Sequence, residues 1–157
     1  MESNQYDIVI IGGGILGLST AMQLLERVPN WRVAVIEKEA QLATHQTGHN
    51  SGVMHSGIYY RPGSHKAQFC VAGLNNMVKF CDENEIEYQQ CGKVIVALNE
   101  SELGRLQDLF ERGTANGVPD LEIVGPERLQ EIEPHVKGVQ ALWAPHTGIV
   151  EFTKVAA

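Results

Sequence analysis

The segment Tyr6 to Lys38, YDIVIIGGGILGLSTAMQLLERVPNWRVAVIEK, decides the fold. Residues 7–11 are a short apolar run rich in β-branched side chains, which is typical of a strand buried on both faces of a parallel sheet. From about residue 15 to 28 apolar side chains recur every three or four residues and predict an amphipathic helix. Residues 32–37 return to a strand pattern. This order predicts an α/β fold with a Rossmann-like dinucleotide-binding domain.

Three glycines, Gly12, Gly14 and Gly17, follow the first strand at G-x-G-x-x-G spacing. The first permits a tight turn, the second lets backbone approach a diphosphate, and the third lets the helix pack close to the strand. The helix begins near Ile15, where free amides and the positive end of the dipole favour an anion. Glu37 ends the second strand, where a carboxylate can accept both hydroxyls of an adenosine ribose. A glutamate there disfavours a 2′-phosphate, so the motif predicts FAD or NAD rather than NADP.

A polar segment with several glycines and histidines follows, over residues 39–63. A long loop that leaves the carboxyl edge of a parallel sheet is usually functional, because ligands of open α/β sheets bind at that edge. We therefore expect this loop to run along the ligand. The further cofactor-binding positions predicted in and beside it are Lys38, His45, Thr47, Gly48, Asn50, Ser51 and Gly52.

The rest of the chain alternates between helical and strand patterns. Asn99 is expected to cap one of the helices, with Glu102 at the third position of a capping box. The predicted helices are 64–84, 99–116 and 126–133, and the predicted strands are 88–98, 121–124, 139–144 and 148–152. We predict that residues 1–87 are the amino-terminal part of an FAD-binding domain with an incomplete parallel sheet. Residues 88–150 are predicted to be part of a mixed α+β substrate domain, and residues 151–157 to start the return to the first.

Composition excludes several classes of function. The formal net charge of −7 disfavours binding to nucleic acid or to an anionic bilayer surface. No stretch reaches the roughly 18 to 20 apolar residues of a membrane-spanning helix, and residues 1–5 do not resemble a signal peptide. Three cysteines without a C-x-x-C pair, Cys70, Cys81 and Cys91, are expected to be reduced thiols, packed rather than reactive. We expect a cytoplasmic protein.

Four segments carry a resemblance to a known family. Residues 6–38 resemble the FAD-binding half of the D-amino-acid-oxidase-like flavoproteins, and residues 45–73, HQTGHNSGVMHSGIYYRPGSHKAQFCVAG, are similar to their L-2-hydroxyglutarate dehydrogenase/oxidase branch. GPERLQEIEPHV at 125–136 and GVQALWAPHTGIVEFTKVAA at 138–157 resemble that branch as well. The resemblance implies FAD-dependent oxidation of L-2-hydroxyglutarate to 2-oxoglutarate. It also implies electron transfer to a membrane quinone in bacterial members, and thus a protein that is cytoplasmic or peripheral on the inner membrane.

Oxidation of a hydroxy acid needs a base, a hydride acceptor and cations for the carboxylates. His45, His49 and His55 are the titratable candidates in the loop. We hypothesise that His55 is the catalytic residue, facing the flavin and contributing to proton abstraction or to substrate orientation. The alternatives are a hydrogen-bonded loop histidine and a covalent histidyl–flavin link. A zinc site on these histidines is disfavoured, because cysteine or acidic partners are missing at ligand spacing. The candidates for shaping the substrate pocket or binding its carboxylates are Tyr59, Tyr60, Arg61 and Lys66, and for Arg61 and Lys66 the alternative is a solvated loop charge.

The sequence leaves other functions open. An amine, an amino acid or glycerol phosphate could be the substrate of an enzyme with the same FAD-binding half. At 157 residues the chain is short for such a flavoprotein, so we expect an amino-terminal portion of a longer protein, which need not be active alone. A truncated product without catalytic activity is the third alternative.

Overall fold

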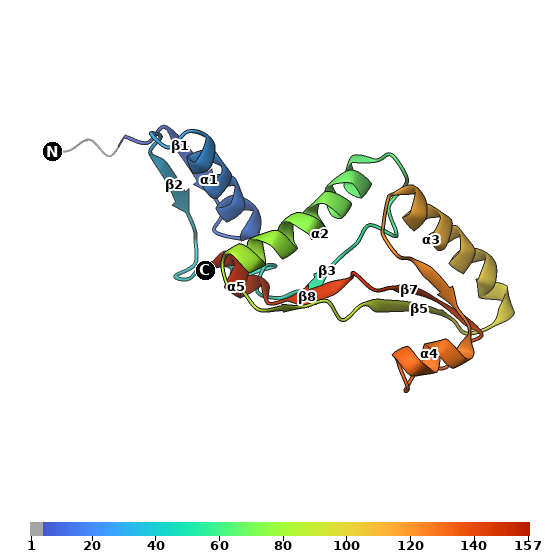
Figure 1. Ribbon diagram of the computed structural model, residues 1–157. Helices are drawn as coiled ribbons and strands as arrows, with labels where there is room; N and C mark the ends of the chain where they lie inside the picture. Colours follow the sequence, from blue (N-terminus) through green and yellow to red (C-terminus); the bar gives the residue numbers. More distant parts are fainter. Residues whose placement is uncertain (1–4) are drawn as a thin grey trace. The chain divides into compact units, whose positions relative to one another are not determined.

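The computed structural model describes residues 5–157, so most of the polar start used to exclude a signal peptide lies outside the described residues. The chain forms two compact units (Figure 1). Unit 1 comprises the residues up to Gly52 together with Glu151–Ala157, and unit 2 comprises Val53–Val150. Residues 53–87 therefore group with the residues that follow them, whereas the predicted domain boundary lies at 87. Compactness does not reveal which residues bind a cofactor, so the assignment of 53–87 to the FAD-binding domain stays a prediction.

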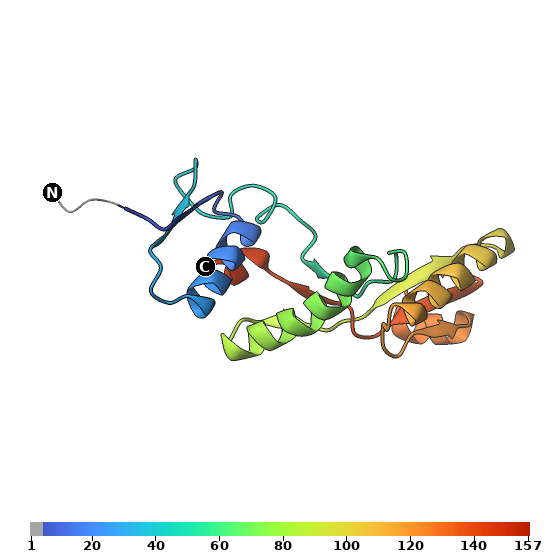
Figure 2. The same ribbon diagram turned by 90° about the horizontal axis from the view of Figure 1, so that it is seen from above.

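Unit 1 is built on a strand, a glycine turn, a helix and a second strand. β1 (Ile8–Ile11) pairs in parallel with β2 (Val33–Ile36), with Ile8 opposite Val33 and Ile11 opposite Ile36. The connection between them is α1 (Ile15–Arg27), which packs on the strands, and α5 (Phe152–Ala156) contacts α1 (Figure 2). The predicted α/β fold with a parallel strand pair is confirmed.

Two glycines of the motif have roles that the geometry explains. Gly12 adopts a φ of 110°, a conformation that side chains other than hydrogen disfavour, and its amide donates to the Ile36 carbonyl at 2.8 Å. Gly17 packs against the turn so tightly that a Cβ atom there would lie 2.0 Å from the Gly12 carbonyl oxygen. The close approach of α1 to β1 that the sequence predicts is therefore present.

Unit 2 contains two antiparallel three-stranded sheets and three helices. One sheet has the order β3-β8-β4, and the other has the order β5-β7-β6. The strand bounds are β3 Val53–Met54, β4 Tyr88–Gln89, β5 Lys93–Ala97, β6 Glu122–Val124, β7 Gln140–Ala144 and β8 Gly148–Val150. The helices are α2 His65–Glu83, α3 Leu103–Ala115 and α4 Pro126–Ile132, with a 3-10 turn at Glu100–Glu102. The mixed α+β character predicted for the later residues is confirmed.

The strand β7, which is central in the β5-β7-β6 sheet, contributes to two hydrophobic clusters. Because neighbouring side chains of a strand point to opposite faces, Leu142 packs in the cluster that includes Leu106 and Leu109 of α3, whereas Ala141 packs against Leu129 of α4. Figure 1 shows α3 and α4 beside this sheet. Consecutive residues of β7 therefore pack against different helices, α3 on one face of the sheet and α4 on the other.

Most predicted elements end within one or two residues of the observed ones, with three differences. The single strand predicted over residues 88–98 is two strands, β4 and β5, which belong to different sheets. The predicted loop 39–63 contains the short strand β3. Asn99 caps its helix by accepting from the Ser101 amide, but the Glu102 carboxylate accepts from the Leu98 amide at 2.7 Å rather than from Asn99. In the described part of the chain, every helix falls short of the length and apolar character that a bilayer crossing demands.

Candidate functional site

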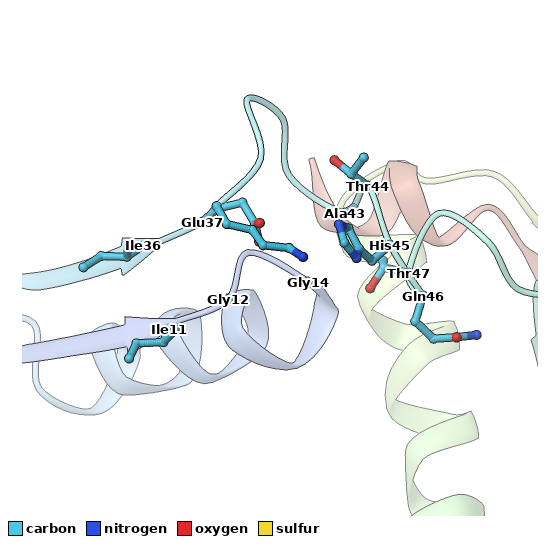
Figure 3. A pocket seen from close by; sticks show the side chains of 11 residues that line it. Ile11, Gly12, Gly14, Ile36, Glu37, Ala43, Thr44, His45, Gln46 and Thr47 are labelled. Carbon is cyan, nitrogen blue, oxygen red and sulfur yellow. The ribbon is translucent and has the colours of Figure 1, made fainter.

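The carboxyl edge of the two strands in unit 1 carries a cavity of about 340 Å³. It lies within the range of roughly 300–1,000 Å³ that is common for ligand pockets. The ends of β1 and β2, the glycine turn and the segment 43–47 surround it (Figure 3). Its lining residues are Ile11, Gly12, Gly14, Ile36, Glu37, Lys38, Ala43, Thr44, His45, Gln46 and Thr47. Six of the predicted cofactor-binding residues are among them.

Glu37 lies at the end of β2 beside the glycine turn. Its Oε2 atom accepts the Gly13 amide at 2.7 Å, and its Oε1 atom accepts the Glu39 amide at 3.0 Å. These hydrogen bonds lower the pKa of the Glu37 carboxyl below its usual range, and the bond from the Glu39 amide has the larger effect. The carboxylate is therefore charged and fixed in direction, as a hydroxyl-accepting group must be.

Thr47 lies opposite, at the amino end of α1. Its Oγ1 atom accepts the Ile15 amide at 3.0 Å. A Cβ atom on Gly14 would lie 3.2 Å from the same Oγ1 atom, a tight contact that a glycine avoids. The Ala43 amide also donates to the Gly13 carbonyl at 3.0 Å, which attaches the loop to the turn.

The remaining loop residues of unit 1 shape the segment rather than line the cavity. Asn50 donates to the Gln46 and Thr47 carbonyls, and its Oδ1 atom accepts the Gly52 amide at 2.7 Å. Gly48 is packed so closely that a Cβ atom would lie 2.6 Å from the Ala43 carbonyl oxygen. Ser51 is exposed. Gly48, Asn50, Ser51 and Gly52 are therefore beside the cavity and not in its wall.

The three loop histidines have different surroundings. His45 lines the cavity, and its Nε2 atom lies 2.8 Å from the Glu39 carboxylate. His49 contacts the His45 carbonyl through Nδ1 at 3.0 Å. His55 belongs to unit 2. Among residues 5–157, no group of three or more histidine, cysteine or acidic side chains is arranged to hold a metal ion.

His55 is exposed but has a defined neighbourhood in unit 2. The Cys70 thiol donates to the His55 carbonyl at 3.2 Å. Partial desolvation, the larger cause, and the positive charge of Lys93 lower the pKa of His55. Its imidazole is therefore neutral near pH 7, which is the form that can accept a proton.

The predicted substrate-binding residues also belong to unit 2. Tyr59 is 48% exposed, and the Lys93 Nζ atom lies 4.6 Å from the centre of its ring. Arg61 and Lys66 are exposed, and no carboxylate of the described residues pairs with them. Tyr59 therefore contacts Lys93, whereas Arg61 and Lys66 have no carboxylate partner among the described residues.

Comparison with known proteins identifies the family. The family described as FAD dependent oxidoreductase (DAO) matches residues 7–157. The chain belongs to this family. The FAD predicted from the glycine motif is thus the cofactor of the family, which decides between the FAD and NAD left open by the motif.

Relatives of this FAD-dependent family extend the match to almost the whole chain. L-2-hydroxyglutarate dehydrogenases are 53% identical in Caenorhabditis briggsae, 50% in Homo sapiens and 51% in Escherichia coli K12, over 97%, 99% and 97% of the chain. The first two are named mitochondrial. The chain spans only 35%, 34% and 36% of the length of these proteins.

Solved structures share the fold. The L-alpha-glycerophosphate oxidase of Mycoplasma pneumoniae, solved with FAD bound, has a TM-score of 0.87 and 28% identity, with 96% of this chain and 40% of that one covered. A glycine oxidase from Bacillus cereus has a TM-score of 0.76 and 27% identity, with 98% and 43% covered. The predicted fold class is confirmed across a family whose members differ in substrate.

Unit 1 fits the dinucleotide end of FAD. The backbone at Gly12 and Gly14 carries no side chain that would block a diphosphate, and α1 begins directly behind it. The charged Glu37 side chain stands at the rim, where ribose hydroxyls need an acceptor. Gly17 holds α1 against the strand rather than lining the cavity.

Sequence reasoning missed several residues around these sites. Gly13, Ala43 and Gln46 were not singled out, because their roles depend on backbone direction in a turn. The sequence pattern indicates for Lys93 only a place near the start of an apolar strand. A lysine that begins such a strand directly after a glycine was the available indication.

Proposed function

We propose that the natural protein oxidises L-2-hydroxyglutarate to 2-oxoglutarate with FAD. The observation that supports this is the high identity to L-2-hydroxyglutarate dehydrogenases over nearly the whole chain. Fold likeness alone would not choose a substrate, since the neighbouring structures include oxidases of glycerophosphate and glycine.

The proposed chemistry separates the two hydrogens of the alcohol. When bound, FAD supplies the acceptor for the hydride that leaves the hydroxyl-bearing carbon. His55 takes the hydroxyl proton, for which its lowered pKa provides the neutral imidazole. In unit 1, Glu37 accepts the ribose hydroxyls and the backbone at Gly14 approaches the diphosphate, while Gly12 makes the turn and Thr47 positions the start of α1 by accepting the Ile15 amide.

The proposal is tested by anaerobic reduction of the flavin in the natural full-length protein. L-2-hydroxyglutarate should bleach the flavin absorbance rapidly, while its D enantiomer should not. Glycerol 3-phosphate, glycine and proline are the comparison substrates for the alternative function. Faster bleaching by one of these, with none by L-2-hydroxyglutarate, would assign the protein to another substrate class.

His55 is tested separately with His55→Gln, which keeps a polar side chain. Loss of a general base typically lowers kcat by about 10²- to 10⁴-fold. Near-normal turnover with normal FAD content would remove His55 from the mechanism. Release of all FAD on denaturation would exclude the covalent histidyl–flavin alternative.

We also propose that a quinone accepts the electrons and that the protein works in the cytoplasm or peripherally on the inner membrane. The relatives are named dehydrogenases, which suggests an acceptor other than oxygen. Reduction of a soluble quinone analogue by substrate-reduced protein, together with cell fractionation, tests both statements. The purified 157-residue chain tests the non-catalytic alternative, because a colourless preparation that FAD does not reconstitute would support it.

A further inference from the structure

Lys93 in unit 2 is a half-buried cation without an anionic partner. It is the first residue of β5, and its backbone pairs with Ala144 of β7. No carboxylate oxygen of residues 5–157 lies within the 4.0 Å of an ion pair from its ammonium group. Burial lowers the pKa of Lys93, and the nearby Cys70 sulfur partly opposes this effect.

Three other lysines differ from Lys93 in both respects. Lys38, Lys79 and Lys154 each lie within ion-pair distance of a glutamate, and their side chains are 73%, 73% and 51% exposed. Partial burial of a charge costs free energy unless an opposite charge or hydrogen bonds compensate. The face of the Tyr59 ring, 4.6 Å from Nζ, compensates only in part. Groups whose pKa is perturbed by burial and by a nearby charge often belong to functional sites, so Lys93 is a candidate for binding an anion.

The segment that faces Lys93 is held rigidly. The Asn116 amide nitrogen donates to the Gly57 carbonyl at 2.9 Å and to the Tyr60 carbonyl at 2.8 Å. Arg112 donates to the Tyr59 carbonyl at 3.2 Å. Ile58, only 1% exposed, anchors the same segment in the core beneath α3. The backbone that carries the Tyr59 ring is therefore held in place beside Lys93.

His55 is tied to the same cluster. The His55 carbonyl accepts the Cys70 thiol at 3.2 Å. The positive charge of Lys93 acts on the pKa of both the His55 and the Cys70 side chain. An anion bound at Lys93 would thus lie in the neighbourhood of the proposed base. A dicarboxylate offers such an anion beside the hydroxyl that loses its proton.

We infer that Lys93, beside the Tyr59 ring, binds one carboxylate of the substrate and disfavours hydroxy acids in which that carboxylate is neutral. This inference rests on the proposed function for the identity of the substrate. It does not require that His55 be the base. A charged hydrogen bond of this kind contributes about 10- to 100-fold to apparent affinity.

The test compares substrates and variants in the natural full-length holoenzyme. The substrates are L-2-hydroxyglutarate and its two monoamides, each of which lacks one carboxylate charge. The variants are Lys93→Met, Lys93→Gln and Lys93→Arg. Lys79→Met, which removes an exposed helical lysine, is the matched control. FAD content and thermal unfolding are measured for each protein.

We expect Lys93→Met and Lys93→Gln to raise KM for the diacid about 10- to 100-fold, with a smaller change in kcat and normal FAD content. Both variants should lose the wild-type preference for the diacid over one monoamide, which identifies the carboxylate bound. Lys93→Arg should keep most of that preference, and Lys79→Met all of it. Unchanged preference over both monoamides in the Met and Gln variants would overturn the inference, because an effect equal for all substrates indicates a structural role. If wild-type flavin is not reduced by L-2-hydroxyglutarate, the proposed function fails instead.

Discussion

Replacing Gly17 with alanine tests the packing on which the cofactor site depends. The added Cβ atom would lie 2.0 Å from the Gly12 carbonyl oxygen and 3.4 Å from the Ile10 Cγ2 atom. Carbon and oxygen atoms rest about 3.3 Å apart even in close contacts, so α1 must retreat by about 1.3 Å. The obstacle is backbone, which cannot rotate away as a side chain can.

The expected cost has two parts. Overpacking of this kind destabilises a fold by about 1–3 kcal/mol. A retreat of α1 also moves its first amides away from the proposed diphosphate, and loss of one charged hydrogen bond of about 1.5 kcal/mol raises the FAD dissociation constant roughly tenfold. We expect both a lower unfolding temperature and weaker FAD binding.

The measurements are thermal unfolding and titration of the apoprotein with FAD, followed by flavin fluorescence. Gly73→Ala in α2 is the matched control, because a Cβ atom there has no atom within 4 Å. In an exposed helical position the same change should stabilise by up to about 1 kcal/mol. The reasoning is refuted if Gly17→Ala unfolds at the same temperature as Gly73→Ala and binds FAD as tightly as the wild type.

Three further predictions concern single side chains. Glu37→Gln should raise the FAD dissociation constant about tenfold. In the wild type the affinity for FAD should stay constant from about pH 7 to about pH 5, because the lowered pKa keeps the Glu37 carboxylate charged. Titration with FAD at each pH checks both statements. His55 must be neutral to act as a base, so the acidic limb of the pH profile of kcat/KM should lie below about pH 6.5. Lys93→Met removes a positive charge and should move this limb to higher pH, whereas Lys93→Arg keeps the charge and should not. An unmoved limb in the Met variant contradicts the prediction. Asn116→Ala removes two hydrogen bonds and should cost about 1–3 kcal/mol in urea unfolding, while Thr114→Ala, an exposed helical change, should cost less than about 0.5 kcal/mol.

Local pattern accounts for the parts of the fold that the sequence predicts well. β1, α1 and β2 follow from side-chain periodicity and from the spacing of Gly12, Gly14 and Gly17, all of which act over a few residues. The position of Glu37 at the end of β2 follows from the same order. Its bonds to Gly13 and Glu39 do not, because they depend on the backbone angles of two turns.

Contacts between distant residues account for what could not be predicted. Lys93 meets Tyr59 and Cys70 only because the sheet and α2 fold together, and nothing near Lys93 in the chain indicates either partner. The grouping of α2 with unit 2 likewise rests on non-local packing, in which Val71 joins the core beneath α3. Amphipathic pattern predicts that a helix has a buried face but not what covers it.

Adjacent side chains of β7 point to opposite faces of its sheet, so they contribute to the packing of different helices. A larger side chain at Ala141 would press on α4, whereas a smaller one at Leu142 would leave a void under α3. Two changes joined by one peptide bond then share no helix contact, so their coupling is limited to what the common backbone transmits. Natural variation can therefore remodel either side of this strand while the other side stays intact.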